Sequence, residues 1–168
     1  MLPRIAHVIR TLSLGIWLGG LIATAVAAVT IFKTMDNRTM AGQVASAVFH
    51  TANLTLLCVA LVALLAQAVL FFSATAKTGP AWRRFGPAAF LLGAMALMLL
   101  MVLWLEPHLR QMQLQIGDFS PRTLNDPQRQ QFRILHSVSV GLVVLEAFCV
   151  GMALAISALP TRDEKVES

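Results

Sequence analysis

The sequence predicts an all-α integral membrane protein, a four-helix bundle with an interfacial helical extension between helices three and four. Of its 168 residues, 57% are hydrophobic and only 12% are charged, whereas soluble domains carry roughly 25% charged residues. Four apolar runs are each longer than the ~20 residues that a helix needs to cross a bilayer. Because four spans leave no room for a soluble domain, we predict a single transmembrane domain over residues 1–168.

The apolar runs predict spans at about 8–32, 46–73, 84–105 and 132–159. The first run follows a basic start and resembles a signal peptide, but it is longer than a typical signal-peptide core, so we expect it to be retained as a helix. Its candidate helix-packing residues are Gly15, Gly19 and Gly20; Gly20 lies on a different face from the small-residue motif Gly15-xxx-Gly19, which Ala23 continues. Such motifs let helices approach closely, which predicts that this face packs against another membrane helix.

The polar connection between the third and fourth runs has helical character. Leu109, Met112 and Ile116 share one face of the segment that follows Pro107, which predicts that the third helix continues along the interface. At the far end of the connection, Asp126-Pro127 has the composition of an N-cap followed by a first helical residue.

The net charge of +5 is spread over the ends of the apolar runs. This distribution suits phospholipid headgroups and gives no indication of nucleic-acid binding. The positive-inside rule gives only a slight preference between the two orientations. We expect both termini to lie in the cytoplasm, with the protein in the cell membrane of a bacterium.

The sequence contains no Gly-rich phosphate loop and no nucleophile with a plausible base, so we do not expect an enzyme.

The fourth apolar run carries Glu146 in its middle. A charged group at the centre of a membrane helix costs roughly 2.5–3.5 kcal/mol on insertion scales, so some partner should offset that cost. No Lys or Arg lies at a comparable depth, which leaves two neutral donors, Trp17 from the first span or Thr55 from the second. Glu146 is then either a hydrogen-bonded structural acid or a site for a proton or another cation.

An alternating bundle brings His50, Glu106, His108 and His136 to one membrane face. Three imidazoles and a carboxylate suit zinc or a related divalent metal, which makes these residues a candidate metal site. Glu106 and His108 can act together only if the helix breaks at Pro107. The alternative is a set of interfacial histidines that hydrogen-bond to headgroups, backbone or one another.

Two other cofactors, haem and Cu(I), are less favoured. His50 and His136 could bind one b-type haem from two helices. Met95, Met98 and Met101 repeat every three residues and could hold Cu(I), but methionine is more often a filler of irregular cores.

The chain resembles the transmembrane protein 205-like family of membrane domains. The likeness rests on the segment from Gly15 to Gly20, on Ala41-Gly42, and on the segment that opens the fourth helix and includes His136. The resemblance implies a four-helix membrane protein without an established biochemical activity, whose animal relatives are associated with resistance to platinum drugs. Over one helix, His7 and Trp17-Leu-Gly-Gly20 also resemble copper-resistance membrane domains.

Two functions follow as hypotheses. The first is a membrane protein that handles a cation or small solute, or confers tolerance to one. The second is a structural or assembly subunit that binds partner membrane helices or a second copy of itself.

Overall fold

The computed structural model describes residues 1–73, 81–116 and 126–159, and over these ranges the chain is helical. Its elements are α1 (Leu2–Thr34), α2 (Arg38–Phe72), α3 (Ala81–Leu100), η2 (Met101–Leu105), α4 (Glu106–Ile116) and α5 (Pro127–Ala158). In the described part of the chain four helices are long and apolar enough to cross a membrane, with α3, η2 and α4 acting as one. The all-α four-helix prediction is confirmed, and the chain is a multi-pass membrane protein.

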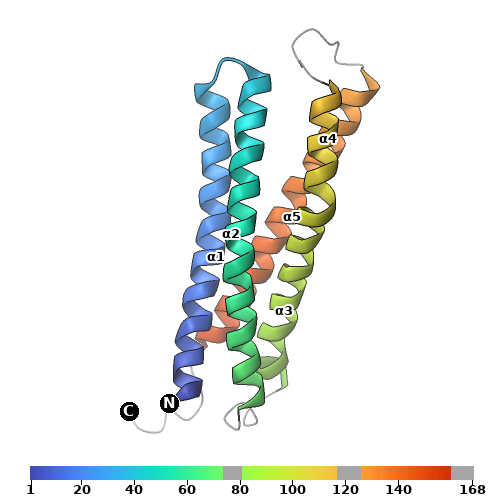
Figure 1. Ribbon diagram of the computed structural model, residues 1–168. Helices are drawn as coiled ribbons and strands as arrows, with labels where there is room; N and C mark the ends of the chain where they lie inside the picture. The colour runs from blue at the N-terminus through green and yellow to red at the C-terminus, as the bar shows by residue number, and fades with distance from the viewer. Residues whose placement is uncertain (74–80, 117–125, 160–168) are drawn as a thin grey trace.

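The helices form two antiparallel hairpins (Figure 1). One hairpin pairs α1 with α2 along their whole length, and the other pairs α3 and its continuation α4 with α5. The hairpins touch where α1 meets α5 and where α2 meets α3. They diverge toward the end that carries the α1–α2 turn, while the start of α1 and the end of α5 lie at the opposite end (Figure 1).

Local sequence sets the helix starts. The Asn37 side chain accepts from the backbone N–H groups of Thr39 and Met40, which satisfies donors that a helix start leaves free. Asp126 does the same for Gln128, with Pro127 as the first helical residue, so the predicted cap of the last helix is confirmed.

The helix from α3 to α4 does not break at Pro107. Instead, the turn before it, η2, widens into a π-helix in which the N–H of Glu106 donates to the carbonyl of Met101. Proline cannot donate to the carbonyl four residues earlier and collides with it, and a widened turn relieves that collision. Because the helix continues, Glu106 and His108 keep their separate directions, and the break that a joint metal site would need is absent.

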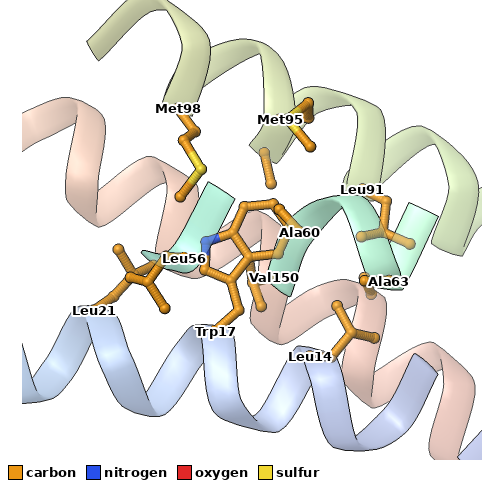
Figure 2. Packing of buried hydrophobic residues seen from close by; sticks show 12 residues of the cluster. Leu14, Trp17, Leu21, Leu56, Ala60, Ala63, Leu91, Met95, Met98 and Val150 are labelled. Carbon is orange, nitrogen blue, oxygen red and sulfur yellow. The ribbon is translucent and has the colours of Figure 1, made fainter. Parts of the chain in front are cut away.

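Trp17 lies at the centre of the core, where all four spanning helices meet (Figure 2). Its side chain is fully buried and is surrounded by Leu56 and Ala60 from α2, Met98 from α3 and Val150 from α5. The small alanine opposite the indole leaves room for the ring between α1 and α2. Met98 fills space beside the ring, as does Met95, in keeping with the predicted role of methionine as a core filler.

Candidate functional site

Polar side chains, at least one of them buried in each case, form three networks at different depths of the bundle. The Arg10 network comprises His7, Arg10 and Gln67; the Trp17–Glu146 pair is the second; the Glu106 network comprises His50, Asn53 and Glu106. Arg10 and Trp17 are separated by about two turns of α1, or ~10 Å. Gln67 and Asn53 are separated by ~21 Å along α2. The three networks therefore lie one after another along the length of the bundle.

The Trp17–Glu146 pair links α1 to α5 inside the bundle. The indole Nε1–H of Trp17 donates to Oε1 of Glu146 over 2.8 Å, and the two side chains are 0% and 3% exposed. Thr55, the other donor considered from the sequence, is exposed and donates to the backbone carbonyl of Thr51. No Lys, Arg or His of the described residues forms an ion pair with Glu146. The carboxyl group is therefore held by one neutral donor.

The Glu106 network joins the two hairpins through α2 and the start of α4. His50 Nδ1 donates to Oε2 of Glu106 over 3.0 Å, and the Asn53 amide donates to the other carboxyl oxygen. Asn53 is buried, Glu106 is half-buried, and His50 is exposed. The Glu106 carboxylate thus accepts one hydrogen bond from a buried amide, that of Asn53, and one from an exposed imidazole, that of His50.

The four-residue metal site expected from the topology is not formed. His108 turns back along its own helix, where its Nδ1 donates to the carbonyl of Trp104 over 2.7 Å. His136 is exposed and stacks on Phe132, with ring centroids 6.2 Å apart. Among the residues that the structure describes, no group of three or more His, Cys, Asp or Glu could hold a metal ion. Of the four predicted residues, only His50 and Glu106 contact each other. The other partner of the Glu106 carboxyl group is Asn53, which was not in the predicted set.

The Arg10 network was not anticipated, because Arg10 stands just before the first uncharged run and resembles a flanking charge. Its guanidinium is nonetheless almost enclosed, at 7% exposure. Nη1 donates to Gln67 Oε1 over 2.8 Å and Nη2 donates to His7 Nδ1 over 3.0 Å. The signal in the sequence is Gln67, a polar residue near the end of the second run that an antiparallel hairpin places opposite Arg10.

The glycines of α1 divide into two groups. A Cβ placed on Gly20 would lie 2.6 Å from Cδ2 of Leu56, so this glycine lets α1 and α2 approach, as predicted. Gly15 and Gly19 are exposed, and a Cβ at either would meet nothing within 4 Å. Within the described chain no helix packs against this pair, so its face is open and the predicted contact with another membrane helix stays a prediction.

Comparison with known protein families matches most of the chain. Residues 12–118, well over half of the chain, match the model of a domain of unknown function, DUF4149. The chain belongs to the DUF4149 family. No curated protein and no solved structure matches the chain. The family assignment supports an uncharacterised membrane domain, and the resemblances to the transmembrane protein 205-like family and to copper-resistance domains stay predictions.

The DUF4149 match runs from α1 to the end of α4 and leaves α5 outside. It includes Trp17 and the complete Glu106 network, whereas Glu146 and His136 lie beyond it. The central hydrogen bond therefore joins an indole of the DUF4149 segment to an acid of the following helix. This pair has the chemistry to hold a proton or another cation, because a carboxyl group that no protein cation neutralises can take one up.

Proposed function

We propose that this DUF4149 protein is a non-enzymatic membrane protein that binds a proton or another cation at Glu146. The observation that carries the proposal is the state of that carboxyl group: it is 3% exposed, at the meeting point of the helices, and bonded to the neutral Trp17 indole. Acidic groups inside membrane helices are costly and mark ion or proton sites in many membrane proteins. Tolerance of a toxic cation is the cellular role that such binding would serve.

The spacing of the networks favours binding over conduction. Leu14 lies between Arg10 and Trp17 on α1, and Leu21 lies beyond Trp17; both are buried. The buried hydroxyl of Ser13 also lies between Arg10 and Trp17, but among the described residues no hydrogen bond joins Glu146 to the network on either side. A proton cannot pass across a ~10 Å gap through direct hydrogen bonds alone. We also propose cytoplasmic termini, for which a reporter fused to the C-terminus is the test; an external signal would reverse the orientation.

Replacement of Glu146 by glutamine tests the proposal. The amide oxygen can still accept from Trp17, so we expect Glu146→Gln to keep the fold, while the group can no longer take up a proton or neutralise a cation. In a deletion strain of the source organism, wild-type protein should restore growth across a panel of toxic cations and pH values, and Glu146→Gln should restore less than about a tenth of that effect. Infrared spectroscopy of the purified proteins should show a carboxyl band lost in Glu146→Gln.

Glu106→Gln is the matched control, because it makes the same chemical change in a half-buried carboxyl group whose imidazole partner, His50, is exposed. We expect this variant to restore growth as wild type does. If Glu146→Gln folds and restores growth fully, Glu146 is a structural acid and the proposal is wrong.

The open face of α1 favours a second candidate function, an assembly subunit. Gly15, Gly19 and Ala23 are exposed at intervals of one helical turn, the spacing that lets two membrane helices pack closely. We expect Gly15→Leu and Gly19→Leu to lower the yield of cross-linked dimer in native membranes at least threefold while leaving monomer stability unchanged. An unaltered cross-linking yield in both variants would contradict the assembly role and leave the cation proposal untouched.

A further inference from the structure

The buried guanidinium of Arg10 carries a positive charge that the described part of the chain does not neutralise. Its two hydrogen-bond partners, Gln67 and His7, accept as neutral groups, and its Nε is buried without a partner. The ion pair of His50 with Glu106 does not involve Arg10 and lies at a different depth of the bundle. Enclosing a charge costs several kcal/mol unless an opposite charge compensates it. An anion beside this network would supply that compensation.

The hydrogen bond from Arg10 also fixes the chemistry of His7. A guanidinium has no acceptor, so His7 Nδ1 must accept, and in the neutral ring the proton then sits on Nε2. His7 itself is exposed. The network therefore holds an imidazole whose free N–H is a donor, with a buried positive charge directly behind it.

A third basic residue, Arg4, lies near His7 and Arg10 at the start of α1. It is exposed and lies one turn before His7 on α1, so Arg4, His7 and Arg10 follow one side of the helix at steps of three residues. The same first turns carry the positive end of the helix dipole, and no side chain caps the start of α1. Exposed apolar residues continue along α1 from this point: Ile5, Val8, Ile9 and Leu12. The arrangement is a cationic group of donors at the end of an apolar surface.

We propose that Arg4, His7 and Arg10 form a binding site for a phosphate group at the membrane surface. Arg4 and His7 Nε2–H contact the phosphate oxygens, and Arg10 acts through His7 as the positioning residue that orients the ring and supplies the enclosed charge. A phosphate suits the site because it offers several acceptor oxygens and a negative charge to a fork of donors. The phosphate can belong to an anionic phospholipid, whose chains would follow the apolar surface, or can be free phosphate.

The test uses the full chain purified in a neutral detergent. Native mass spectrometry measures adducts with phosphatidylglycerol and phosphatidylcholine, and a parallel titration with inorganic phosphate follows the ³¹P resonance. We expect the phosphatidylglycerol adduct to exceed the phosphatidylcholine adduct about tenfold, and Arg10→Gln to remove this preference. Broadening by inorganic phosphate without a lipid preference would identify free phosphate as the ligand of the same site.

Two exposed positions keep the test clear of misfolding, since Arg10→Gln alters a buried network. The double variant Arg4→Gln with His7→Phe should fold as wild type and lose the preference as well. Arg38→Gln is the matched control, because it removes one exposed positive charge at the opposite end of the bundle. Unchanged phosphate and lipid binding in the double variant, or an equal loss in Arg38→Gln, would overturn the proposal.

Discussion

Trp17→Ala should lower the free energy of unfolding by about 3 kcal/mol or more, a large effect for a single substitution in this chain. Removing a buried aromatic ring from a packed core typically costs about 3–5 kcal/mol, through lost contacts and the cavity that remains. Lipid is as apolar as the core, so here the loss comes from packing and not from transfer out of water. Trp17 touches three partner helices, and the cavity would open between all of them.

Trp17→Phe separates packing from hydrogen bonding. Phenylalanine keeps an aromatic ring in the site but removes the N–H that donates to Glu146. Interhelical hydrogen bonds in membrane proteins average about 0.6 kcal/mol and reach about 1.7 kcal/mol, so we expect this variant to lose about 1–2 kcal/mol once the smaller ring is included. Unfolding in mixed micelles with increasing denaturing detergent measures both variants. A loss below about 1 kcal/mol for Trp17→Ala would contradict the central position of the indole.

The sequence predicts the helices and narrows the partner of Glu146 to two donors, Trp17 and Thr55, between which the structure decides. Uninterrupted apolar runs specify membrane helices because a helix satisfies its backbone groups in lipid within a single segment. The Trp17–Glu146 pair was within reach because an acid in mid-membrane needs a partner and few donors lie at its depth. The sequence also predicts the helix cap at Asp126, because proline is common at the first position of a helix and an acidic residue before it is a typical N-cap.

The other side-chain contacts could not be predicted, because the spacing of residues along the chain does not determine how the helices bend or which of their faces pack together. Whether Glu106 and His108 converge depends on how the helix accommodates Pro107, and the π-turn before it avoids the break that convergence would need. Arg10 could not be distinguished from a flanking charge, because its burial depends on Gln67 from another helix. The Gly15 and Gly19 motif predicts close helix contact but does not say whether the partner belongs to the same chain.

Adjacent glycines on α1 allow a sharp comparison, because Gly20→Leu should be destabilising and Gly19→Leu should not. Leucine at position 20 would drive its side chain into the end of the Leu56 side chain, which is itself enclosed beside Trp17 and has little room to move aside. Overpacking of this kind typically costs about 1–3 kcal/mol, and more where the backbones must separate. At position 19 the new side chain would meet no atom of the chain, and surface changes usually stay within about 0.5 kcal/mol.

The same two variants should behave oppositely in self-association. Gly20→Leu acts inside the α1–α2 hairpin, so it should lower monomer stability without a specific effect on dimer yield among folded molecules. Gly19→Leu should leave the melting temperature in detergent unchanged and reduce the cross-linked dimer. Equal loss of stability in both variants would mean that α1 rotates its Gly19 face into the bundle, and the open face from which the assembly role is inferred would then not exist.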